Sequence, residues 1–161
     1  MTPNQLDGIL HLLLILAPFV AVLLFINVIL RGVAWLGGWS SLAAIYPGRT
    51  QTEGETWTFR SMRFGFWAAY NNCVTIGGDS QGLHLSMPWF ARAGHEPIFI
   101  PWSDIQIAEK QTILGLFPVV SLAFKKCPTV RLRLQASLLG QVQAGARSLR
   151  AAAAEHVESN H

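Results

Sequence analysis

The sequence predicts one N-terminal transmembrane helix, then a mainly-β domain of about seven antiparallel strands, capped by a C-terminal helix. Three observations predict this order. Residues 8–30 carry no Lys, Arg, Asp or Glu, which is typical of a helix that crosses a bilayer. Residues 57–134 contain short runs of alternating or β-branched residues separated by turn residues, as strands do. Residues from 137 onward regain the composition of a helix.

The uncharged segment between Asp7 and Arg31 is long enough to span the hydrocarbon core of a bilayer, at about 33 Å when helical. A cleaved signal peptide is a weaker interpretation, because the residues before the segment include no Lys or Arg. A fully buried helix is weaker still, since the remaining chain is short for a domain that would enclose it. We therefore expect residues 1–31 to anchor the protein in a membrane.

The flanking charges predict the orientation of this helix. The N-terminal flank carries only Asp7, whereas Arg31 and every other Lys and Arg follow the segment. Because positive charge accumulates on the cytoplasmic side, we expect a single-pass protein of the inner (cytoplasmic) membrane, with its N-terminus outside and its C-terminal domain in the cytoplasm. Cys73 and Cys127 form no CxxC pair and are expected to be buried, reduced thiols.

Residues 32–55 are predicted to hold a short helix, either interfacial or packed on the domain, followed by a polar linker. Trp35 and Trp39 lie where an aromatic belt is expected, and Arg31 can extend toward lipid headgroups. These three residues are the predicted membrane-interface anchors. Asn27 lies one turn before Arg31 and is expected either to be hydrated at the interface or to hydrogen-bond to a partner helix.

Residues 56–154 are predicted to form the folded domain, and residues 155–161 a tail. Turns that contain Gly, Pro or Asp separate the predicted strands, and GGDSQG at residues 77–82 is a hairpin signal. The strand-like runs read TWTFRSMRF, AYNNCVTI, GLHLSM, PIFIPW, DIQIAEKQTI, VVSLAF and TVRLRL. In the helix that follows them, Leu138, Val142 and Leu149 are the expected inward positions.

The order of elements and one short motif resemble a known family. The chain reads GLHL at residues 82–85 and IPWSDI at residues 100–105, and this GLxL … IPWxxI pattern is similar to that of bacterial membrane-anchored PH/GRAM-like domain proteins. The resemblance covers the chain from Gly38 to Arg150. It implies a pleckstrin-homology-like, partly open barrel capped by a C-terminal helix. It implies a fold and a membrane location, but no reaction.

The residue pattern offers little support for catalysis. The five histidines are scattered, and no HExxH, P-loop, GxSxG or dinucleotide-binding motif occurs. His84 alternates with Leu83 and Leu85, so it is expected on the exposed face of its strand. His95 and Glu96 are expected to form a charged loop tip. We therefore expect no enzyme activity, no metal or other cofactor, and no small-molecule substrate.

Basic residues offer a candidate binding surface. A net charge of +3 with 13% charged residues lacks the broad positive field of a nucleic-acid-binding protein, so no nucleic-acid partner is expected. The first and last strands lie near each other in a PH-like barrel, so their arginines could form one face toward anionic headgroups or a partner. The alternative is a solvated face without a ligand. The candidates are Arg60, Arg63, Lys125, Lys126, Arg131 and Arg133.

The aromatic content favours a protein partner. Six Trp and nine Phe are more than one small barrel needs to bury. We expect a non-enzymatic accessory or scaffold subunit that docks on a larger integral-membrane assembly, for example a photosynthetic or respiratory complex. The alternative is a membrane-tethered adaptor that binds anionic lipid headgroups. The aromatic residues at or near predicted turns are Phe64, Phe66, Trp67, Trp89, Phe90 and Phe117.

Overall fold

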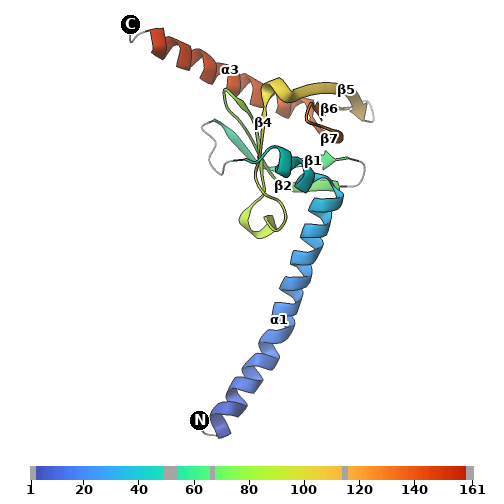
Figure 1. Ribbon diagram of the computed structural model, residues 1–161, viewed down its shortest axis with the longest axis vertical. Coiled ribbons are helices and arrows are strands. Elements are labelled where there is room, and N and C mark those ends of the chain that lie inside the picture. Colours follow the sequence, from blue (N-terminus) through green and yellow to red (C-terminus); the bar gives the residue numbers. More distant parts are fainter. Residues whose placement is uncertain (1–2, 49–53, 66–67, 114–115, 159–161) are drawn as a thin grey trace.

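The computed structural model describes residues 3–48, 54–65, 68–113 and 116–158, and it confirms the predicted fold class. A long helix, α1 (Pro3–Leu36), projects from a domain of one sheet and two further helices, α2 (Trp39–Ile45) and α3 (Ala136–Glu158) (Figure 1). The strands are β1 (Thr56–Phe64), β2 (Ala68–Gly78), β3 (Gly82–Ser86), β4 (Ile98–Pro101), β5 (Ile105–Ile113), β6 (Phe117–Phe124) and β7 (Cys127–Gln135). Two single turns of 3₁₀ helix, η1 (Trp89–Ala91) and η2 (Trp102–Asp104), flank β4.

The strands form one antiparallel sheet that curls into a half-barrel, in the order β4-β3-β2-β1-β7-β6-β5. The first and last strands of the chain are therefore neighbours, as expected, and β4 and β5 are the two edges. Bulges interrupt the β1–β2 pairing, where Phe59 and Asn72 adopt positive φ angles of 55° and 51°. Bulges increase the local twist of a sheet, and they help this sheet to curl.

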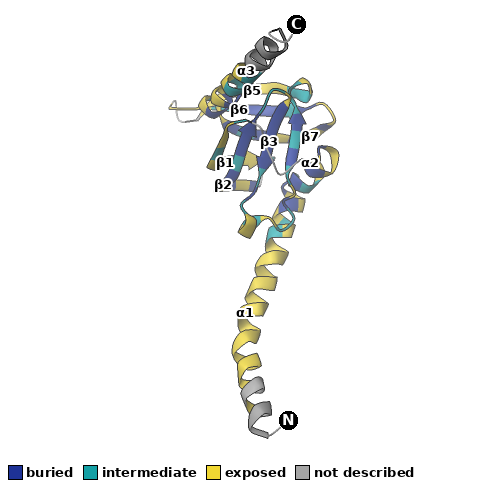
Figure 2. Ribbon diagram, turned by 90° about the vertical axis from the view of Figure 1, so that its left-hand side faces the viewer, coloured by how far each residue is buried: buried dark blue, intermediate teal, exposed yellow. Residues whose placement is uncertain are grey.

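The core lies on the inner face of the sheet, under α2 and α3 (Figure 2). Leu83 and Leu85 of β3 are fully buried there, as the alternation predicted. Helix α3 packs directly on β2. The two elements are so close that a Cβ added to Gly78 of β2 would lie only 2.4 Å from Val142 Cγ1 of α3. Leu138 and Val142 point inward, as predicted.

Two predicted boundaries differ from the structure. Arg31 does not end the first helix, which continues past Gly32 to Leu36 and ends where the Gly37–Gly38 pair follows. Gly38 then adopts a φ of 86°, and this left-handed conformation turns the chain into α2. At the other end, residues 155–158 of the predicted tail belong to α3.

The last two turns of α1 are part of the domain. Ala34 is fully buried in the domain core. A Cβ atom added at Gly94, in the loop after β3, would lie 2.9 Å from Arg31 Cα. A Cβ atom added at Gly37 would lie 2.5 Å from Ala68 Cβ of strand β2. The loop and the strand therefore both pack against the end of the helix. One continuous helix therefore carries both the apolar segment and the contacts that attach it to the domain.

Candidate membrane and anion-binding site

One helix within the described residues is long and apolar enough to cross a membrane. The stretch His11–Leu36 of α1 contains an 18-residue window with a mean hydropathy of 2.9. Every side chain from His11 to Ile29 is exposed, and apolar side chains cover all sides of the helix. A helix that is apolar all round needs an apolar environment, which a bilayer supplies. Pro18 lies inside the helix without ending it.

Arg31 and Asn27 interact with each other at the end of this apolar segment. Arg31 Nε donates a hydrogen bond to Asn27 Oδ1 over 3.0 Å, and both side chains are exposed. The predicted contact of Asn27 with a partner helix therefore competes with a contact inside its own helix. The hydrogen bond directs the Arg31 side chain back along α1, toward the N-terminus of the helix.

The two tryptophans that were predicted as interface anchors differ in burial. Trp35 is 71% exposed, as an interface residue would be. Trp39 is fully buried, and its indole N–H donates to Glu96 O over 2.8 Å, so the prediction that it is a membrane-interface anchor was wrong. The turn at Gly38 directs α2 across the sheet and so places Trp39 against Phe64, with ring centroids 5.1 Å apart.

His95 also lies in this buried cluster, and not at a loop tip as predicted. Its Nδ1 lies 2.9 Å from Ala93 O and its Nε2 lies 2.9 Å from Tyr70 Oη. Since a carbonyl only accepts, Nδ1 carries the proton and Nε2 of the neutral ring accepts from Tyr70. Burial lowers the pKa of His95 and raises that of Tyr70, which favours the neutral forms that this arrangement requires.

His84 is buried as well, which corrects the prediction that it lies on an exposed face. Its ring lies 4.7 Å from the Phe99 ring, and Nε2 lies 2.7 Å from Asp79 Oδ2. Burial alone would raise the pKa of Asp79, but hydrogen bonds from His84, Gly82 and Gln81 outweigh it and lower that pKa. Alternation placed His84 on the outer face, but it could not show that Phe99 and Asp79 cover that position.

Three of the six candidate basic residues come together on the outer face of the sheet. Arg63 of β1 and Arg133 of β7 are direct cross-strand partners, and Arg131 lies two residues along β7 on the same face. Arg60 belongs to β1 but lies beyond a bulge. Paired arginines repel each other, so this placement favours an anion between them.

Arg63 and Arg133 line a cavity of about 210 Å³, here called the arginine groove. Arg133 Nε is buried and finds no hydrogen-bond partner among the described residues, so the groove holds an unused cationic donor. Sequence reasoning missed the polar residues around it, because only strand register brings them together. These are Ser61, Asn71, Gln111 and Gln135, and the remaining lining residues are Met62, Val119 and Leu134.

Lys125 and Lys126 lie apart from the arginine groove, in the turn between β6 and β7. Lys126 Nζ lies 3.6 Å from Asp104 Oδ2, and Tyr46 donates a hydrogen bond to the same oxygen over 3.1 Å. The backbone N–H of Lys125 donates to Asp104 O. These contacts, one of them through the backbone of Lys125 only, attach the turn to the end of α2 and to η2. Neither lysine lines the arginine groove, so the structure does not bring all six basic candidates together.

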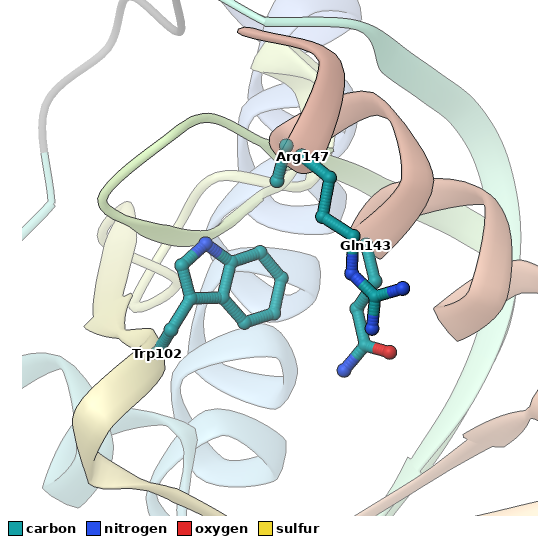
Figure 3. A pocket seen from close by; sticks show the side chains of 4 residues that line it. Trp102, Gln143 and Arg147 are labelled. Atoms are coloured by element: carbon teal, nitrogen blue, oxygen red, sulfur yellow. The ribbon is translucent and has the colours of Figure 1, made fainter. Parts of the chain in front are cut away.

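A smaller cavity of about 140 Å³ lies between η2 and α3, where Trp102 faces Gln143 and Arg147 (Figure 3). The Trp102 indole N–H donates to Asp79 O over 2.9 Å, which fixes the ring as one wall of this cavity. Its lining of Trp102, Gln143, Ala146 and Arg147 includes one cation but no carboxylate, thiol or hydroxyl group. These residues offer contacts to a ligand but no nucleophile or general base.

The remaining aromatic candidates divide between core and surface. Phe64 is buried, whereas Trp89, Phe90 and Phe117 are exposed. Phe66 and Trp67 lie outside the described residues. Cys127 is buried and Cys73 is half-buried, and both are free thiols as expected. Within the described residues, no group of three His, Cys, Asp or Glu side chains is placed to hold a metal ion.

Comparison of the chain with protein-family profiles, with curated proteins and with solved structures finds no match in any of the three. The resemblance to PH/GRAM-like proteins therefore depends on the residues of the GLxL … IPWxxI pattern. Function has to be argued from the geometry of α1, the domain and the arginine groove.

Proposed function

We propose that this chain is a single-pass membrane adaptor whose domain binds an anionic group at the membrane surface through the arginine groove. The observation that carries the proposal is the cross-strand pair of Arg63 and Arg133 with its unpaired, buried Nε. The proposal assigns binding, and no catalytic step, to this site. The cytoplasmic location of the domain and the inner membrane remain the orientation that the positive-inside rule favours.

The position of the groove relative to α1 supports a lipid headgroup as the ligand. Gly65 donates its backbone N–H to Arg131 O over 2.8 Å, and a Cβ on Gly65 would lie 4.0 Å from Gly37 O, at the end of α1. The Arg63–Arg133 pair lies two residues farther along β7, a step of about 7 Å. Headgroups extend several ångströms beyond the hydrocarbon core, and in this proposal the long arginine side chains extend toward them.

The test follows the Arg133 Nε–H signal by NMR in the full-length chain in nanodiscs. We expect the signal to shift as phosphatidylglycerol replaces phosphatidylcholine. Arg63→Gln should weaken the response about 5-fold, because each basic residue near the surface contributes about 1 kcal/mol. Arg60→Gln is the matched control on the same strand, and it should change the response little.

A second arm of this experiment separates the two sources of a phosphate group. Free glycerol 3-phosphate is added to nanodiscs of phosphatidylcholine alone. A shift with this compound but not with phosphatidylglycerol would assign the groove to a soluble phosphate. No shift in either arm, or equal effects of Arg60→Gln and Arg63→Gln, would contradict anion binding in the groove.

Docking on a membrane protein is the second candidate function, and edge strand β5 favours it. A cleft of about 390 Å³ lies between this strand and α3, with Ile107 and Leu139 in its lining. Leu116 and Phe117 are exposed beside the same strand. An unpaired edge with exposed apolar side chains is a surface that a partner chain can cover.

Site-specific photo-crosslinking in native membranes tests this second candidate. A photoreactive residue at position 117 should give a product with a membrane protein, and the same residue at exposed position 103 should give none. Gentle detergent extraction should then recover the chain together with that partner. Recovery of the chain alone, with no product from position 117, would contradict docking at this edge.

A further inference from the structure

Among the described residues, the most exposed tryptophan lies in the loop between β3 and β4. Trp89 is 85% exposed and Phe90 is 59% exposed, and the two rings meet edge to face with centroids 5.9 Å apart. Both belong to η1 and turn away from the core. In Figures 1 and 2 this loop hangs from the domain on the side where α1 leaves it. The loop that carries the pair therefore lies on the side of the domain from which the apolar helix extends.

Contacts place this loop beside the end of the apolar segment. A Cβ on Gly94 would lie 2.9 Å from Arg31 Cα and 3.4 Å from Ala34 Cβ. If the hydrocarbon core covers about 20 residues of α1 from His11, its boundary falls next to Arg31. The loop therefore touches α1 at the level where lipid tails give way to headgroups.

The loop is held firmly in this position. Met87 and His95 are buried on its two sides, and Trp39 donates to Glu96 O over 2.8 Å. The turn itself is closed by hydrogen bonds from Ala91 N to Pro88 O and from His95 N to Arg92 O, each 2.9 Å long. A loop fixed at both ends presents its aromatic pair without a further ordering cost.

We propose that Trp89 and Phe90 insert into the interfacial layer of the membrane that α1 spans and so form a second membrane contact. Tryptophan prefers this layer, because its ring is apolar and its N–H can still reach water or headgroups. Arg31 and Arg92 are exposed around the pair, and their charges suit lipid phosphates. With α1 and the loop both in the bilayer, tilting the domain away from the membrane would withdraw the aromatic pair from the interface and would be opposed.

This inference rests on the proposed membrane span, so the experiment tests both together. Nitroxide labels are attached at Val22→Cys, Phe90→Cys and Phe117→Cys in full-length Cys73→Ala chains in nanodiscs. These lipid discs contain no partner protein. Collision rates with oxygen, which concentrates in lipid, and with a nickel chelate, which stays in water, report the surroundings of each label. We expect oxygen to dominate at positions 22 and 90, and the nickel chelate at position 117.

The possible results separate the two proposals. Lipid-like values at position 22 with water-like values at position 90 would overturn the insertion of the loop and leave the span intact; the aromatic pair would then be free for a protein. Water-like values at position 22 would overturn the span and, with it, the second contact. Position 117 is the matched control, because Phe117 is similarly exposed at 54% but lies at the β5–β6 end of the sheet.

Discussion

At the scale of single residues, Trp39 connects parts of the chain that are far apart in sequence. Its ring lies within 5.5 Å of the Phe64, Tyr70 and His95 rings, measured between centroids. Its N–H holds the β3–β4 loop through Glu96. One buried side chain thus fixes α2, β1, β2 and the loop beside α1 together.

Replacement of Trp39 by Phe should lower the free energy of unfolding by about 1–3 kcal/mol, because it removes a hydrogen bond and leaves a void. Trp35→Phe is the matched control: this side chain is exposed, and its loss should change stability by less than about 0.5 kcal/mol. Denaturant titration of the full chain in detergent measures both. Equal effects of the two substitutions would contradict the assignment of Trp39 to the core.

His95 should make the stability of the domain depend on pH. Because burial lowers its pKa in the folded state, the unfolded chain binds the proton more readily. The contribution of neutral His95 is complete above the unfolded pKa of about 6.5 and declines as the pH falls below it. The melting temperature of the domain should therefore fall as the pH is lowered from 8 to 5.

The variant His95→Gln provides the control for this pH dependence. It cannot titrate in this range, so its melting temperature should fall less than that of the natural chain between pH 8 and pH 5. The comparison uses the slope of melting temperature against pH, because the substitution also lowers stability at every pH. An unchanged slope would show that another group causes the pH dependence.

At the scale of elements, the contact between α1 and the β3–β4 loop requires glycine. Gly94 has a φ of 73°, and a Cβ there would meet the backbone of Arg31 at 2.9 Å. Both the conformation and the space exclude a larger residue without movement. The contact between α1 and the β3–β4 loop thus depends on Gly94, which the sequence pattern indicates only as part of a turn.

Gly94→Ala should lower stability by about 1–3 kcal/mol, because the helix and the loop must separate to admit the added methyl group. Gly32→Ala is the matched control: nothing lies within 4 Å of a Cβ at that position, and Ala favours a helix by up to about 1 kcal/mol. Thermal unfolding compares the two. A Gly94→Ala chain as stable as Gly32→Ala would contradict the tight joint.

Much of the element pattern could be predicted from the sequence, because it depends on local signals. The apolar run of α1 and the alternation of Leu83 with Leu85 follow from such signals, whereas the neighbouring positions of the first and last strands were expected only from the resemblance to a PH-like barrel. The burial of Trp39, His84 and His95 could not be predicted, since each is covered by residues distant along the chain or across strands. The arginine groove likewise depends on register: Arg63 and Arg133 are 70 positions apart in the sequence and become partners only through the β1–β7 pairing.

At the scale of the whole molecule, the continuous helix α1 gives the domain one position relative to the apolar segment, and so relative to the membrane that we propose this segment spans. A flexible linker would let the domain move freely above the bilayer, whereas buried Ala34 and the Gly37 and Gly94 contacts hold it on the helix. The arginine groove and the β3–β4 loop are then both presented close to the membrane surface. This fixed placement is the central claim about the molecule.

The most direct test of that claim is a pulsed-EPR distance measurement between labels at Val28→Cys on α1 and Ser103→Cys on η2. It uses the full-length Cys73→Ala chain in nanodiscs, with Gly94→Ala as a comparison. We predict one narrow distance distribution, which broadens when Gly94→Ala disturbs the joint. A broad distribution in the chain without Gly94→Ala would contradict the fixed placement of the domain on α1.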